Sequence, residues 1–170
     1  MLPYHDESRA VLPIAASVLF AYLDDHARLA AHMSKSSWRM GGGRMSIELD
    51  EAGGHRVGSR IRMAGRVLGI SLALEEAVTE YEVPHRKVWE TIGQPRLLVV
   101  GGYRMGFEIS PQPHGSQLRV FIDYDLPRAT PVRGLTALLA RYYARWCTSQ
   151  MVTDAVKHFS TADLPLEVQM

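Results

Sequence analysis

The stretch YRMGFEISPQPHGSQLRVFIDYDLP, residues 103–127, decides the fold. Apolar side chains alternate along both of its halves, and a turn rich in proline and glycine separates them. Alternation with a period of two is typical of a strand with one buried face. The stretch therefore predicts a long β-hairpin, whose apolar face covers either a packed core or a bound ligand. That face consists of Tyr103, Met105, Phe107, Ile109, Leu118, Val120, Ile122 and Tyr124.

Further strands precede this hairpin in the chain. Their period-two patterns occupy residues 44–50, 56–65, 70–83 and 87–92, with short turns between them. Together with the hairpin they predict about six consecutive antiparallel strands. The alternation of residue types falters at Glu75 and Glu76. A β-bulge is expected there.

The remaining segments predict one more strand and three helices. A first strand is expected over 9–16, a short helix capped by Ser17 after it, and a second short helix over 25–33. Residues 132–159 predict the longest helix, with apolar residues at three- and four-residue steps. Such an α+β chain must cover the apolar face of its sheet, and only this helix is large enough. Its apolar residues are Leu135, Leu138, Leu139, Tyr142, Trp146, Met151, Val152, Val156 and Phe159.

Composition excludes several classes of protein. Nineteen basic and eighteen acidic residues leave a net charge of +1, which argues against nucleic acid as a partner. The single cysteine, Cys147, excludes an internal disulfide framework and fits a reducing cytoplasm. No apolar run approaches the roughly 18 residues that cross a bilayer, so no integral membrane segment is expected. A soluble cytoplasmic protein is therefore predicted.

Four segments within this order of elements resemble the START-like, or SRPBCC, superfamily, and most nearly its polyketide cyclase/dehydrase branch. The resemblance covers residues 8–159 and implies a helix-grip fold. In that fold a curved antiparallel sheet of about seven strands surrounds a long C-terminal helix, and two short helices follow strand 1. It also implies a single domain over 1–170 with a tail at 160–170. The segments are VLPIAASVLFAYLDD (11–25), EAGGHRVGSRIRM with VLG (51–69), AVTEYEVPHRKVWE (77–90) and SQLRVFIDYDLP (116–127).

The polar residues offer few candidates for chemistry. None of the seven histidines forms an HxH or HExxH pair, so no metal site and no cofactor are expected. Glu75 and Glu76 mark the best place for an inward carboxylate, although a solvated edge is the favoured interpretation. The GGGR segment at 41–44 predicts a flexible loop, with gating of a pocket as the alternative. Cys147 is expected to be an inert core thiol.

The aromatic residues are the most informative group. Tyrosine and tryptophan combine a flat apolar wall with one polar tip that can orient a ligand, although a packed core explains the same pattern. The hydroxyl groups of Tyr103, Tyr124 and Tyr142 are the preferred polar tips. The full predicted ligand-binding set is Trp38, Met63, Trp89, Tyr103, Met105, Phe107, Tyr124, Tyr142 and Trp146.

Three functions remain open at this stage. Members of the superfamily bind lipids, sterols, quinones, plant hormones and polyketides, and only some are enzymes. The leading hypothesis is a cavity between sheet and C-terminal helix for a small hydrophobic molecule that is lipid-like, polyketide-like, isoprenoid or aromatic. A cyclase or dehydratase is the first alternative, favoured if a carboxylate of Glu75 or Glu76 faces the cavity beside a tyrosine hydroxyl. The second is a protein-interaction or chaperone-regulating module with a filled interior. A homodimer paired through an edge strand also remains open.

Overall fold

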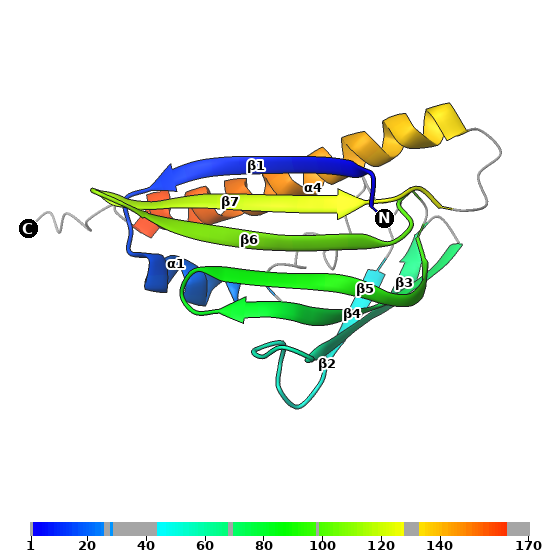
Figure 1. Cartoon of the computed structure of the whole chain (residues 1–170), viewed down its shortest axis with the longest axis horizontal. Helices are drawn as coiled ribbons and strands as arrows, with labels where there is room; N and C mark the ends of the chain where they lie inside the picture. Colours follow the sequence, from blue (N-terminus) through cyan, green and yellow to red (C-terminus); the bar gives the residue numbers. More distant parts are fainter. Residues whose placement is uncertain are drawn as a thin grey trace, which may run out of the picture.

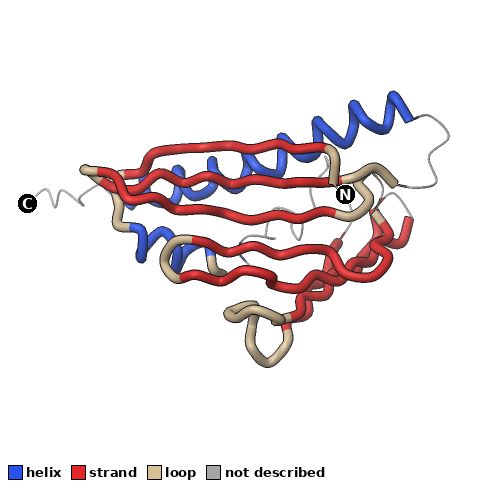
Figure 2. Tube along the Cα trace, in the orientation of Figure 1, coloured by secondary structure: helices blue, strands red, loops and turns tan. Residues whose placement is uncertain are grey.

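The computed structural model describes residues 2–25, 28, 44–67, 70–97, 99–127 and 133–162. These residues form one antiparallel sheet in the order β1-β7-β6-β5-β4-β3-β2, and the two helices lie on the same face of it (Figures 1 and 2). The predicted α+β class, with about seven strands and a long C-terminal helix, is confirmed. The elements are β1 (Tyr4–Leu12), α1 (Ala16–Leu23), β2 (Arg44–Leu49), β3 (Arg60–Val67), β4 (Ile70–Glu82), β5 (Arg86–Arg96), β6 (Tyr103–Gln112), β7 (Gly115–Tyr124) and α4 (Arg133–Ala162).

The predicted hairpin is the pair β6–β7. Tyr103 lies opposite Tyr124 and Phe107 opposite Val120, so both apolar rows face the helices as the alternation requires. Gly115 opens β7 with φ of 145°, and a Cβ atom there would overlap the carbonyl oxygen of Leu12. Glycine is needed at this position because the hairpin turn packs directly on the end of β1.

Two expectations for the N-terminal region are wrong in detail. The first strand begins at Tyr4 rather than at residue 9. Its first residues are mostly polar and belong to the strand because they pair with β7, so an apolar pattern does not reveal them. One of them, Ser8, faces α4, and its hydroxyl lies 3.1 Å from that of Thr148. The N-cap of α1 is Ala15, without a side-chain hydrogen bond, and Ser17 lies inside the helix. The second short helix falls almost entirely outside the described residues, and the loop that follows it lies wholly outside them.

In the first half of α4 the face that covers the sheet differs from the predicted one, whereas Met151 and Val152 of the second half are buried as predicted. Small and medium-sized residues pack against β1 and β7, whereas the predicted leucines of the first half are exposed. Apolar residues at helical spacing identify an apolar face of a helix. Which face of α4 packs on the sheet also depends on how closely the backbone of the helix approaches the backbone of the sheet. The buried residues are Ala140, Ala144, Cys147, Met151, Val152 and Ala155, and the exposed ones are Leu135, Leu138, Leu139 and Tyr142.

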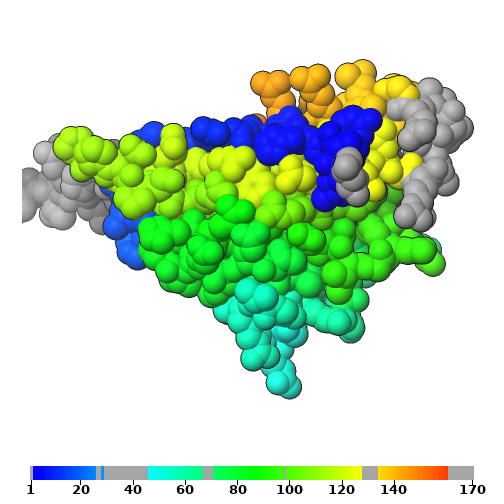
Figure 3. Space-filling view, in the orientation of Figure 1, coloured from blue at the N-terminus to red at the C-terminus, as the bar shows by residue number. Residues whose placement is uncertain are grey.

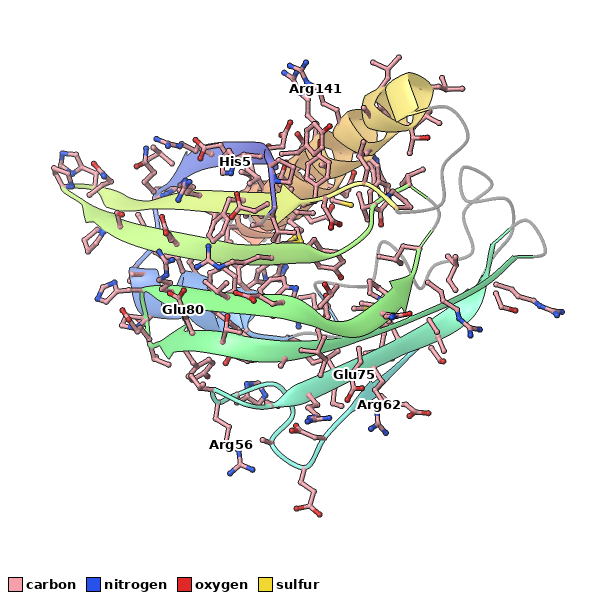
Figure 4. All side chains as sticks on the ribbon, turned by 45° about the vertical axis from the view of Figure 1, so that its right-hand side comes forward. His5, Arg56, Arg62, Glu75, Glu80 and Arg141 are labelled. Atoms are coloured by element: carbon pink, nitrogen blue, oxygen red, sulfur yellow. The ribbon has the colours of Figure 1, made fainter. Side chains whose placement is uncertain are left out.

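The core has two parts. The first core cluster lies between the helices and β1, β5, β6 and β7, and includes Trp89, Phe107 and Tyr124. The second core cluster consists of Ile61, Met63, Leu74 and Val78, where the sheet curves into β3 and β4 (Figure 4). Three partly buried residues pack against both clusters: Tyr81, Leu97 and Tyr103.

The opposite face of the sheet carries an ion-pair network. Phe121 points outward from β7, and three guanidinium groups cover its ring at 5.0–5.9 Å from the centroid. His5 and Glu80 mark two ends of this face in Figure 4. Asp123 lies here and pairs with His5 and Arg104. The network consists of His5, Glu7, Arg9, Glu80, Arg86, Glu90, Arg104, Glu108, Arg119 and Asp123.

Candidate functional site: a buried carboxylate between sheet and helix

Glu76 of β4 points into the interior. The inward residues of this strand are Leu72, Leu74, Glu76 and Val78, and all four side chains are buried. Glu75, the adjacent residue, faces outward and pairs with Arg60 at 3.1 Å and Arg62 at 3.4 Å (Figure 4). The preference for a solvated edge was therefore correct for Glu75 and wrong for Glu76.

The predicted irregularity is present beside these residues, but it does not set the direction of Glu76. Ala73 pairs with Arg96, and Glu75 pairs with Ile92. An advance of two residues along β4 therefore corresponds to an advance of four residues along β5. The extra residues are in β5, where Gly93 has φ of 71°. The alternation of β4 runs unbroken through Glu76, and only the residue type changes.

Tyr103 of β6 donates a hydrogen bond from its hydroxyl to Glu76 Oε1. Its backbone is held by Thr91 of β5, whose Oγ1 accepts from the Tyr103 N–H at 3.0 Å. Burial, together with the nearby Glu76 carboxylate, raises the pKa of Tyr103 well above its ordinary value of 10. The hydroxyl therefore keeps its proton at neutral pH and acts as a fixed donor.

Two residues of α4 complete the cluster from the helix side. Tyr143 and Cys147 lie one turn apart with their side chains hydrogen-bonded, and both interact electrostatically with Tyr103. The neighbouring Cys147 and burial raise the pKa of Tyr143 well above 10. Burial raises the pKa of the Cys147 thiol to about 12. Because a thiol must ionise to act as a nucleophile, the expectation that Cys147 is inert is consistent with this environment.

The polar cluster, defined as Glu76, Tyr103, Tyr143 and Cys147, lies where the two core clusters meet. Tyr103 packs against both core clusters, so apolar side chains border its polar group on two sides. Such surroundings strengthen each hydrogen bond inside. The arrangement can bind the polar end of an otherwise apolar molecule, and it can hold or move a proton between Glu76 and Tyr103.

The structure brings most of the predicted ligand-binding residues into the interior. Tyr103 and Trp146 are half-buried, and Trp38 lies outside the described residues. Tyr142 does not belong with them, because its side chain is 74% exposed on the far side of α4. Five residues of the set are buried: Met63, Trp89, Met105, Phe107 and Tyr124.

The predicted set omitted three members of the polar cluster: Glu76, Tyr143 and Cys147. For Glu76, its even spacing from Leu72 and Leu74 was the available signal. Tyr143 and Cys147 share a helix face with Ala140 and Ala144, both buried. A search of α4 for its small-residue face would have found them.

A second buried polar group holds α1 against the sheet. Lys87 is fully buried on the inward face of β5, and its ammonium lies 2.5 Å from Asp24 Oδ1. Tyr81 donates to Asp24 Oδ2 at 2.6 Å, and His55 lies 2.8 Å from the same oxygen. Burial opposes ionisation of Asp24, but these hydrogen bonds outweigh it and lower its pKa. Burial lowers the pKa of Lys87 despite its pairing with Asp24. No sequence pattern pointed to this group.

A groove of about 380 Å³ lies at β2–β5, and most of its lining residues occupy outward positions. Arg62 and Glu75, which form an ion pair, are among them. The groove therefore belongs to the solvated face of the sheet and is separate from the polar cluster.

Comparisons with known proteins identify the architecture. No family model matches the sequence, and no curated protein matches it. Among solved structures, TTHA0849 from Thermus thermophilus has a TM-score of 0.66 at 14% identity, covering 95% of this chain and 100% of that one. Ara h 8.0201 has a TM-score of 0.60 at 11% identity, covering 91% and 98%.

A third similar structure is the di-domain ARO/CYC StfQ from the steffimycin biosynthetic pathway. Its TM-score is 0.60 at 14% identity, covering 93% of this chain and 50% of that one. The match therefore spans half of a two-domain protein. This chain has the START-like fold.

The START-like fold agrees with the resemblance drawn from the four sequence segments. At these identities the likeness establishes architecture, and function has to be argued from the side chains. In this chain the polar cluster spans β4, β6 and α4. None of the helices in the described part of the chain is long and apolar enough to cross a bilayer.

Proposed function

We propose that this protein binds a small, largely apolar molecule between the sheet and α4, with the polar end of the molecule at Glu76 and Tyr103. The observation that carries the proposal is the buried carboxylate–phenol pair at the junction of two apolar clusters. Small-molecule sites typically combine an apolar lining with a few convergent polar groups. Lipid-like, isoprenoid, aromatic and polyketide-like molecules share this chemistry.

The polar pair explains how such a ligand would be oriented. Tyr103 has one hydroxyl proton, which it donates to Glu76. A ligand carbonyl would take over this donor, and a ligand hydroxyl would donate to the Glu76 carboxylate instead. A ligand hydroxyl or carbonyl group would exchange its water for these groups, while its hydrocarbon part contacts side chains such as Trp89 and Met105. The proposed lining retains Met63, Trp89, Tyr103, Met105, Phe107, Tyr124 and Trp146 from the sequence-predicted set, with Trp38 as a further proposed member, and omits Tyr142.

Binding can be tested directly. The purified protein would be extracted with organic solvent for mass spectrometry, and its thermal shift measured with a panel of lipids, isoprenoids and aromatic ketones. For a ligand with a polar end, Tyr103→Phe is expected to weaken binding about 2- to 12-fold, since a hydrogen bond between neutral groups contributes about 0.5–1.5 kcal/mol. Tyr142→Phe removes the same atom from an exposed position and is expected to change nothing.

Circular dichroism would first establish that both variants are folded. The proposal fails if the wild-type protein carries no extracted molecule and responds to no member of the panel. It also fails if a ligand is found but Tyr103→Phe and Tyr142→Phe bind it equally.

The inward carboxylate favours an enzyme as the second candidate function. If the Tyr103 hydroxyl turns from Glu76 to donate to the oxygen of a bound ketone, the released Glu76 carboxylate could accept a proton from the carbon next to that ketone. A carboxylate of Glu76 beside a tyrosine hydroxyl is one part of the arrangement expected for a cyclase or dehydratase. StfQ, the similar ARO/CYC structure, comes from a biosynthetic pathway.

Proton transfer can be followed as deuterium uptake at the methyl carbon of a bound aryl methyl ketone, by NMR. Glu76→Gln is expected to slow the exchange by about 100-fold or more, a typical contribution of general acid–base catalysis. Its ketone affinity, measured in parallel, should stay within a few-fold of wild type. Exchange at the wild-type rate in Glu76→Gln would exclude this candidate and leave the binding proposal intact.

A further inference from the structure

The first half of α4 presents large apolar side chains to solvent. We name Leu135, Leu138, Leu139 and Tyr142 the α4 apolar face; their side chains are 57%, 66%, 46% and 74% exposed. Their spacing of three and four residues places them on one stripe of the helix. The buried Ala140 and Ala144 lie on the opposite side, against the sheet. The stripe is therefore an outward face and does not contribute to the core.

The same helix shows what an ordinary outward face looks like. Two and three turns beyond Tyr142 the stripe continues through Ser149 and Thr153, which are exposed and polar. The apolar surface is thus confined to the first half of α4. This half lies clear of the strands in Figure 1, and its side chains stand out from the surface in Figure 3. Large exposed apolar side chains gathered in one place are typical of an interaction surface.

The charged residues of α4 beside this face are all basic. Arg141 and Arg145 are exposed next to the stripe, and Arg141 points away from the sheet in Figure 4. The sequence from Arg133 to Thr153 contains no acidic residue. The chain as a whole carries a net charge of only +1. Positive charge is therefore locally concentrated where the apolar side chains are exposed.

We infer that the α4 apolar face docks the protein on the surface of an anionic lipid bilayer. A helix with an apolar face and flanking arginines lies in the membrane interface, with its apolar side chains in the boundary between headgroups and acyl chains. The arginines attract anionic headgroups over a distance that salt shortens. This attachment is peripheral, and it does not depend on whether a molecule binds at Glu76 and Tyr103.

The test uses the full chain and vesicles of phosphatidylcholine alone or mixed with phosphatidylglycerol, followed by co-sedimentation. We expect binding to the mixed vesicles that weakens with added salt, and little binding to phosphatidylcholine alone. Arg141→Gln with Arg145→Gln should lower the partition coefficient roughly 25-fold, at about fivefold per arginine. Leu138→Gln with Tyr142→Gln should remove binding at both salt concentrations, because the apolar contribution is lost.

The matched control is Val11→Gln with Val83→Gln, two apolar residues exposed to a similar extent elsewhere, at 64% and 62%. It should bind like the wild-type protein. Equal binding of wild type and Leu138→Gln/Tyr142→Gln would overturn the inference, as would equal binding to both vesicle types. So would a dimer, seen by sedimentation equilibrium, that this double variant dissociates while no vesicle binding occurs. The substituted positions are exposed, and circular dichroism would verify that each variant is folded.

Discussion

Replacing Asp24 with asparagine lowers the free energy of unfolding by about 3–5 kcal/mol, the expected cost of leaving a buried charge without its partner. The Lys87 ammonium is fully buried and lies 2.5 Å from the Asp24 carboxylate. The substitution also weakens the hydrogen bonds from Tyr81 and His55 to the same oxygen. Urea denaturation at neutral pH measures the change. The control is Asp25→Asn, because Asp25 is next in the chain but about half exposed. This variant should change the free energy of unfolding by less than about 1 kcal/mol.

The pH dependence gives this prediction a second readout. The folded protein holds the pKa of Asp24 below its ordinary value, so the ionised carboxylate contributes stability above the pKa that Asp24 has in the unfolded chain. That contribution is lost as the pH falls through the lower, folded-state pKa. The stability gap between wild type and Asp24→Asn should therefore shrink below about pH 4, near the unfolded pKa of aspartate.

A double variant separates the loss of the ion pair from any steric effect of the substitution at Asp24. Asp24→Asn with Lys87→Met removes both charges and should recover much of the stability, since an apolar residue can replace a buried ion. A single Asp24→Asn variant within about 1 kcal/mol of wild type would mean that the buried pair does not hold α1 to the sheet.

Truncating Phe107 to alanine is expected to lower the free energy of unfolding by about 3–5 kcal/mol, the usual cost of deleting a buried aromatic ring. Phe107 is fully buried, and its ring contacts Phe20 of α1 at 5.5 Å and Trp89 of β5 at 6.4 Å between centroids. The variant loses this burial and leaves a cavity where the hairpin meets α1. Urea denaturation with the same protocol measures the loss.

The control for this truncation is Tyr142→Ala, which removes an aromatic ring of similar size from an exposed position. It should change the free energy of unfolding by no more than about 0.5 kcal/mol. Comparable losses in the two variants would contradict the assignment of Phe107 to the core and of Tyr142 to the surface.

The sheet could be predicted from the sequence because the local alternation of apolar and polar residues indicates each strand. Successive side chains of β6 and β7 face opposite sides of the sheet, as the alternating sequence predicts. Because a short turn can join only antiparallel neighbours, the short turns also predict the pairing of the strands. The long helix followed from its uninterrupted periodicity in the same way. The inward orientation of part of the proposed lining could also be predicted, since Tyr103, Trp89 and Met105 belong to the apolar rows that these patterns reveal.

Other features depended on contacts between segments distant in the chain. Glu76 breaks the apolar pattern of β4, so local reasoning favoured solvent, yet the sheet buries it beside a tyrosine 27 residues away. Lys87 follows the same logic, because Asp24 lies 63 residues before it and only folding brings the two charges together. The sequence pattern likewise did not fix which face of α4 meets the sheet. Close packing of the helix on the sheet places the alanines at the contact and leaves the leucines of the first half exposed.

The amino-acid sequence by itself thus determined the order and type of the described elements and the inward parity of their apolar strand residues, since backbone periodicity acts over a few residues. Tertiary structure alone decided which polar groups are buried together and which side of α4 remains exposed. Burial of a charge becomes tolerable only when a partner from another element neutralises or hydrogen-bonds it. That compensation is a property of the assembled fold.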